Sequence, residues 1–179
     1  MSNTSKQYDE VVKNCSDIFL KKMKDYGVAW RILRPSSITD QLFIKAQRLR
    51  TIQEKGTQKI EDNQEAEFIG LVNYSVMGLI QLEKGAEENF DVKLEDAEGI
   101  YKSKLELSKK LMLDKNHDYG EAWRDMRVSS LTDLILMKLL RIKQIEDNKG
   151  KTIISEGIDA NYLDIINYAI FAMILLNEK

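Results

Sequence analysis

The sequence has very little of the residues on which several classes of protein depend. Among 179 residues there are one cysteine, one proline, one histidine and nine glycines. A single cysteine excludes an intramolecular disulfide and a cysteine-rich zinc site. A single histidine excludes a multi-histidine metal site within one chain. A fold of many short strands needs more turn residues than this, so a β-sandwich or β-barrel is not expected.

Long hydrophobic runs and a strong charge of one sign are also missing. No uninterrupted apolar run approaches the roughly 18 residues needed to cross a bilayer. The first residues lack the apolar core of a signal peptide. Lysine and arginine number 27 against 29 aspartates and glutamates, a net charge of -2, so the average charge gives no strong nucleic-acid signal. We therefore predict a cytoplasmic protein with no membrane partner.

What the sequence does contain is an internal repeat. The segment Lys24–Ile52 aligns without a gap with His117–Ile145, at an offset of 93 residues. Of the 29 aligned pairs, 14 are identical, whereas chance would give roughly two. Two copies are too few for a solenoid. We interpret residues 1–90 and 91–179 as two repeats that pack against each other as the subunits of a homodimer do, but within one chain.

Hydrophobic residues recur at three- and four-residue steps in each unit, which predicts three helices per unit. The predicted helices span Gln7–Lys24, Ser37 toward Gly56, Gln64–Lys84, Ile100–Asn116, Ser130 toward Gly150, and Asn161–Glu178. Asp40 and Asp133 follow Ser37 and Ser130 in an S-x-x-D pattern, which we interpret as a helix start. The acid-rich segment 86–98 is predicted to be an exposed linker.

A unit of about 85 residues is too small to bury an apolar stripe on each of three helices by itself. Packing the two units against each other removes this difficulty. The predicted fold is therefore all-α, with the two three-helix units packed about a pseudo-twofold axis as one globular bundle.

Polar residues interrupt the apolar stripes at equivalent places in both units. Lys45 and Lys138 lie within the stripe of the second helix, each followed three residues later by Arg48 or Arg141. Asn73 and Asn167 lie within the stripe of the third helix. A buried lysine can reach solvent along its stem, and a buried asparagine can fix helix register. A cationic pair also suits an anion, so a phosphate ligand is the alternative.

A second duplicated feature is the motif Asp-Tyr-Gly-x-Ala-Trp-Arg after the first helix of each unit. Gly27 and Gly120 are predicted to end the helix in a left-handed turn, and the tryptophans to anchor the connection. Tyrosine and tryptophan also offer flat faces for a base, with aspartate and arginine for hydrogen bonds. The predicted ligand-binding residues are Asp25, Tyr26, Trp30, Arg31, Lys45, Arg48 and Asn73, with Asp118, Tyr119, Trp123, Arg124, Lys138, Arg141, Asp164 and Asn167.

These paired motifs, with the following Ser-Ser-x-Thr-Asp helices and the Asn-Tyr of the third helix, resemble the nucleotide-modification-associated domain family, type 1. The resemblance covers nearly the whole chain, once per unit. It implies a link to nucleotide or DNA-base modification.

A more distant likeness is to the MazG-like all-α nucleoside triphosphate pyrophosphohydrolases. Those enzymes bind Mg²⁺ through Glu-Glu-x-x-Glu and Glu-x-x-Asp motifs on successive helices. Here Lys45 and Lys138 lie where a carboxylate cluster would be expected, and only Asp164-x-x-Asn167 approaches the second motif. We predict no metal site in the free protein, and Mg²⁺ only together with a nucleotide.

Two functions from different classes remain open at this point. The first is a protein that binds a nucleotide or another phosphorylated small molecule and acts in nucleotide metabolism or modification; the catalytic residues, if there is a reaction, are not assigned. The alternative is a non-catalytic helical scaffold or assembly module, a homo-oligomer included, in which the polar residues only set helix register.

Overall fold

The computed structural model describes residues 3–56, 63–87 and 93–178. These residues form helices and no strand. The α-helices are α1 (Asn3–Tyr26), α2 (Pro35–Lys55), α3 (Gln64–Lys84), α4 (Leu94–Tyr119), α5 (Val128–Asp147) and α6 (Ile158–Asn177), and two short 3₁₀ helices are η1 (Ala29–Ile32) and η2 (Ala122–Asp125). The predicted all-α fold of two three-helix units is confirmed.

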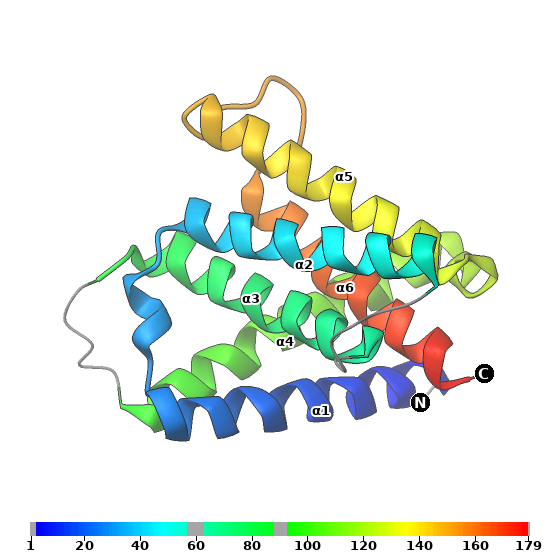
Figure 1. Ribbon diagram of the computed structural model, residues 1–179, viewed down its shortest axis with the longest axis horizontal. Coiled ribbons are helices and arrows are strands. Elements are labelled where there is room, and N and C mark those ends of the chain that lie inside the picture. Colours follow the sequence, from blue (N-terminus) through cyan, green and yellow to red (C-terminus); the bar gives the residue numbers. More distant parts are fainter. Residues whose placement is uncertain (1–2, 57–62, 88–92, 179) are drawn as a thin grey trace.

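The helices form three layers, and each layer contains one helix from the first unit and one from the second (Figure 1). The outer layer is α2 with α5, the central layer is α3 with α6, and the other outer layer is α1 with α4. The most extensive contacts are those of α3 with α6, α5 with α6, α2 with α3 and α2 with α5. The second and third helices of both units therefore build the common core, as a pseudo-twofold bundle requires.

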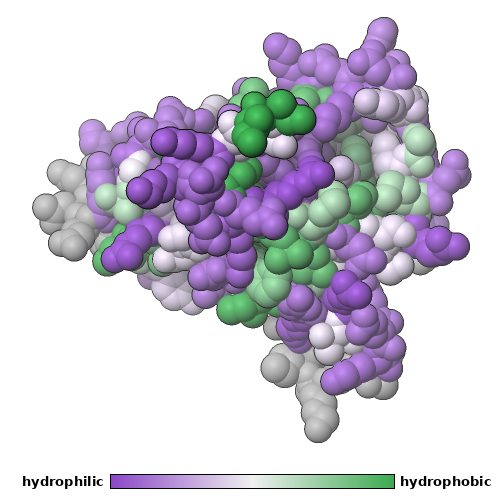
Figure 2. Space-filling model, turned by 90° about the horizontal axis from the view of Figure 1, so that it is seen from above, coloured by the Kyte–Doolittle hydropathy of each residue, from purple (hydrophilic) through white to green (hydrophobic). Residues whose placement is uncertain are grey.

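Helix α6 is the most apolar of the described helices. By length and composition alone it could span a membrane, but 72% of that window is buried inside the protein. Its hydropathy is that of a central helix contacted from several sides. The face seen in Figure 2 is instead mostly hydrophilic, with hydrophobic patches between the polar side chains.

Some predicted helix ends need correction. Helices α1, α4 and α6 begin four, six and three residues earlier than predicted, at Asn3, Leu94 and Ile158. The predicted linker 86–98 therefore includes the first turn of α4. Its acidic Glu95 and Asp96 suit a helix N-terminus, because carboxylates there face unpaired N–H groups. Residues 88–92 of that linker lie outside the described part of the chain.

The interpretation of Asp40 and Asp133 as helix-start residues is wrong. Helix α2 begins at Pro35, whose missing N–H costs nothing in the first turn, and α5 begins at Val128. Both aspartates therefore fall in the second turn of their helices, past the unpaired N–H groups. Instead they form ion pairs between α2 and α5: Asp40 with Lys143 at 3.3 Å, and Asp133 with Arg50 at 3.7 Å.

Candidate functional site

A cavity of about 570 Å³ lies in the first unit, between α1, η1, α2 and α3. Four predicted ligand-binding residues line it: Tyr26, Trp30, Lys45 and Asn73. Its other walls are mostly apolar, with Ile18, Phe19, Ile69 and Met77 among them. An apolar cavity with a few polar groups is the usual form of a small-molecule site, and this volume lies within the usual range.

Lys45 is the charged residue that α2 contributes to this cavity. Its side chain lies over Gly70 of α3, where a Cβ atom would meet Lys45 Nζ at 3.2 Å. Its Nζ is 5.5 Å from the centre of the Tyr74 ring and 3.7 Å from Glu67 Oε2. Glu67 itself accepts a hydrogen bond from Arg48 Nη1. Arg48 is thus held by a carboxylate of its own unit, and Lys45 has a longer, weaker pairing.

Lys22 supplies a second ammonium group to the cavity wall, and the sequence analysis missed it. The signal was present, because Lys22 and Lys115 match at the offset of 93 residues, just before the aligned segment begins. Lys22 lies one turn before Tyr26 on α1, so both point toward the same opening. No ion pair of Lys22 is found within the described ranges.

The aromatic residues of the first-unit motif lie at different depths. Trp30 on η1 is half-buried against Phe19, with ring centres 6.2 Å apart and planes tilted by 55°. Tyr26 is 71% exposed at the rim, and Asp25 is exposed beside it. Gly27 follows α1 with a φ of +62°, and Gly120 follows α4 with a φ of +66°, values that favour glycine. The ψ of Gly120 is −152°, so the predicted left-handed helical turn is wrong at that residue.

Both predicted asparagines are buried and fully engaged inside the bundle. Asn73 Nδ2 donates to the Cys15 carbonyl at 3.1 Å, and its Oδ1 accepts from Tyr101 at 2.6 Å. In the other unit, Asn167 Nδ2 donates to the Ser108 carbonyl at 3.1 Å, and its Oδ1 accepts from Tyr8 at 2.8 Å.

Each asparagine therefore joins the first helices of both units to a central helix. Burial raises the pKa of Tyr8 and of Tyr101, so both phenols remain protonated donors. These bonds account for the burial of the asparagine amides without a ligand.

Arg31 also forms hydrogen bonds and an ion pair with residues of its own unit. It is 2% exposed, donates to Gln81 and to the Gly85 carbonyl, and pairs with Glu87 at 3.4 Å. Gln81 Nε2 in turn donates to the carbonyls of Arg31 and Leu33. These contacts fasten η1 to the end of α3 and so hold the neighbouring Trp30 in place.

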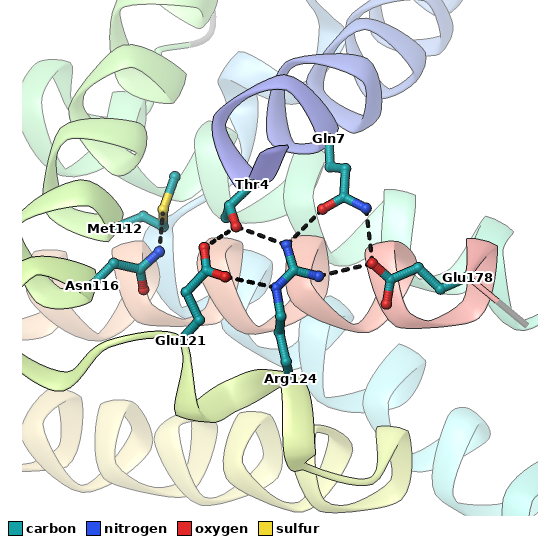
Figure 3. Close-up of polar contacts among 7 residues, drawn as sticks. All are labelled: Thr4, Gln7, Met112, Asn116, Glu121, Arg124 and Glu178. Atoms are coloured by element: carbon teal, nitrogen blue, oxygen red, sulfur yellow. Dashed lines mark hydrogen bonds and ion pairs between the residues drawn. The ribbon is translucent and has the colours of Figure 1, made fainter. Parts of the chain in front are cut away.

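Arg124, the counterpart of Arg31, fastens η2 to both ends of the chain (Figure 3). Its guanidinium donates to Thr4, Gln7, Glu121 and Glu178 at 2.6 to 2.9 Å. Gln7 also donates to Glu178 at 2.8 Å. Like Arg31, this side chain fixes a short helix between longer ones.

The predicted residues of the second unit do not form a matching set of exposed groups. Lys138 pairs with Asp164 at 2.9 Å, and Lys115 pairs with the other oxygen of Asp164 at 2.7 Å. Trp123 is buried and stacks on Phe171, with ring centres 4.2 Å apart and planes 5° from parallel. The remaining predicted residues, Asp118, Tyr119 and Arg141, are exposed.

No group of three or more histidine, cysteine or carboxylate side chains able to hold a metal ion occurs among the described residues. The charged residues that line the first-unit cavity, within the described part of the chain, are Lys22 and Lys45. A cavity of this kind is suited to an anionic ligand with an apolar or aromatic part.

The comparison of sequences identifies the family to which these repeated units belong. The family described as nucleotide modification associated domain 1 matches residues 22–82 and again residues 115–176. Together the matches cover about two thirds of the chain. The chain therefore belongs to this family and carries its domain twice, as the resemblance implied.

Neither a curated protein nor a solved structure matches the chain. The more distant likeness to the MazG-like pyrophosphohydrolases is not shown by these comparisons.

Proposed function

We propose that this protein binds a nucleoside phosphate in the cavity of its first unit, and that it serves nucleotide metabolism or modification in this way. The observation that carries the proposal is the pairing of two lysines, Lys22 and Lys45, with an indole ring, Trp30, around one cavity of about 570 Å³. Lysine is a common phosphate ligand in proteins. Aromatic rings bind bases of any sequence by stacking.

The family membership supports the same proposal. The domain is described as associated with nucleotide modification, and a nucleotide is the ligand that combines a phosphate with a planar ring. In this proposal Lys22 and Lys45 bind phosphate, while Trp30 and the exposed Tyr26 contact the base. Any Mg²⁺ would arrive with the nucleotide phosphate, since no carboxylate is found among the described residues that line the cavity.

A thermal-shift screen tests this proposal. The chain is melted with each of the four deoxynucleoside monophosphates and triphosphates, with and without Mg²⁺, and with nucleosides and inorganic phosphate as controls. A bound nucleotide raises Tm because it binds only the folded state. Lys45→Met should weaken nucleotide binding by about tenfold or more, the contribution of one charge-assisted contact.

Lys55→Met is the matched control, because Lys55 is exposed at the end of the same helix and does not line the cavity. It should leave the affinity unchanged. The proposal is wrong if no nucleotide shifts Tm at millimolar concentration, or if the two variants bind equally well.

A further inference from the structure

The duplication allows the two units to be compared position by position. Lys22 and Lys45 of the first unit correspond to Lys115 and Lys138 of the second, at an offset of 93 residues. On the third helix the offset is 94, and three positions of the cavity wall differ. Ile69 corresponds to the similar Leu163. Gly70 corresponds to Asp164, and Met77 corresponds to Phe171.

In the second unit, Asp164 occupies the place between the two lysines. One carboxylate oxygen lies 2.7 Å from Lys115 Nζ and the other lies 2.9 Å from Lys138 Nζ. The Asp164 and Lys138 side chains are 6% and 10% exposed. A single anionic group, with one oxygen toward each ammonium, is therefore the partner that this pair of lysines accepts.

In the first unit, the corresponding place carries no side chain. Gly70 has no carboxylate, and a Cβ there would lie 3.0 Å from Lys45 Cδ and Cε and 3.2 Å from Nζ. Glu67 is the nearest carboxylate to Lys45, but it is bound by Arg48 and remains 3.7 Å from Lys45 Nζ. The first unit thus has no carboxylate at the position that Asp164 occupies in the second, although both lysines line its cavity.

The aromatic half of the site differs in the same way. In the second unit Phe171 lies flat on Trp123, nearly parallel and 4.2 Å away. In the first unit Met77 replaces that ring, and both Met77 and Trp30 face the cavity. A methionine side chain is flexible and adapts to a bound ring. The second unit therefore holds, from its own chain, a carboxylate that the first unit lacks. It also has a ring parallel to its tryptophan, where the first unit has only the tilted ring of Phe19.

We infer that the side chains of the second unit occupy its own site and so identify the ligand of the first unit. That ligand is one nucleoside monophosphate per chain. Its phosphate lies between Lys22 and Lys45 over Gly70, and its base lies at Trp30 and Met77. This inference rests on the proposed function. It adds the position of each half of the ligand, the number of phosphate groups and the stoichiometry.

Gly70→Asp tests the inference, with Gly70→Asn as its matched control. Both side chains press equally on the flexible end of Lys45, but only aspartate supplies the charge. Without nucleotide, Gly70→Asp should melt roughly 2–4 °C above Gly70→Asn, because it recreates the bridge between two lysines. In calorimetry with dAMP, dCMP, dGMP and dTMP, the wild-type chain should bind one nucleotide. Gly70→Asp should bind it at least tenfold more weakly than Gly70→Asn.

Met77→Phe tests the ring position separately. It should weaken the same deoxynucleotide and its nucleoside alike, whereas Gly70→Asp should weaken only the nucleotide. A wild-type protein that binds none of the four but is stabilised by a triphosphate overturns this inference alone. One that is stabilised by no nucleotide at all overturns the proposed function. Binding of two nucleotides per chain, or equal affinity of the two Gly70 variants, overturns this inference and leaves the proposed function standing.

Discussion

Lys45 and Lys138 occupy equivalent residues of two helices but have different partners. Lys138 bonds to Asp164, which is almost fully buried, whereas Lys45 approaches Glu67 only to 3.7 Å and is 27% exposed. The sequence predicted that both lysines interrupt an apolar stripe, and left a lysine that reaches solvent along its stem and a phosphate ligand as alternatives. The residues that separate the two cases, Asp164 and Gly70, occupy corresponding positions on the third helices, and an ion pair of Lys138 with Asp164 could already be suspected from the sequence. The bridge of Asp164 to Lys115 as well required the three-dimensional contacts.

Lys138→Met should destabilise the fold. The substitution keeps the apolar stem but leaves the buried Asp164 carboxylate with Lys115 alone, and breaking a buried pair in this way costs about 3 kcal/mol. Urea unfolding followed by circular dichroism measures the change in free energy.

Lys45→Met is the comparison for that experiment. Its free energy of unfolding should change by less than about 1 kcal/mol, because a partly exposed, longer ion pair contributes little. Equal stability of Lys138→Met and the wild-type chain would contradict the structural role of the Lys138–Asp164 pair.

At the scale of helices, the sequence predicted all six α-helices of the described chain, and α3 with its bounds Gln64–Lys84. The periodicity of hydrophobic residues predicted these helices because the buried residues of each recur at helical spacing. The starts of α2 and α5 were placed too late, since the serine pattern was taken for a cap where no side chain caps the helix. The short helices η1 and η2 were missed, because four-residue turns have no period to detect.

Gly78→Ala should weaken the crossing of α3 and α6. A Cβ at Gly78 would lie 2.9 Å from the Tyr162 ring, and that ring is held by a 2.7 Å hydrogen bond between its hydroxyl and the hydroxyl of Thr39. Overpacking of this kind costs about 1–3 kcal/mol, more than the roughly 1 kcal/mol that alanine gains over glycine within a helix. The free energy of unfolding in urea should therefore fall.

Gly99→Ala on α4 is the matched control. No heavy atom lies within 4 Å of a Cβ at that position, so only the helix preference acts and stability should rise by up to about 1 kcal/mol. A Gly78→Ala protein that is also more stable than the wild type would show that the helices can separate without cost.

At the scale of the whole molecule, each unit completes the other. Tyr101 of the second unit satisfies Asn73 of the first, and Tyr8 of the first satisfies Asn167 of the second. The prediction of a shared core rested on the size of the units, but these reciprocal bonds join residues about 30 and 160 positions apart, which no sequence period connects. Pairing of that kind is visible only when the chain is folded.

Residues 1–90 alone should not form a stable monomer. Separation would expose the faces of α2 and α3 that pack on α5 and α6, and would leave buried polar groups without partners. Thermal denaturation of the fragment should show no cooperative transition. Mixing it with residues 91–179 should restore one. A sharp transition from the first fragment as a monomer would show instead that the units are independent domains.

The position of the chain ends has a practical consequence for handling the protein. Gln7 and Glu178 are hydrogen-bonded to each other, so both ends leave the bundle together at one side (Figure 1). Helix α1 then runs from there to Lys22, roughly 30 Å at 1.5 Å per residue. A surface tether, fluorophore or fused domain at either end would therefore be remote from the cavity.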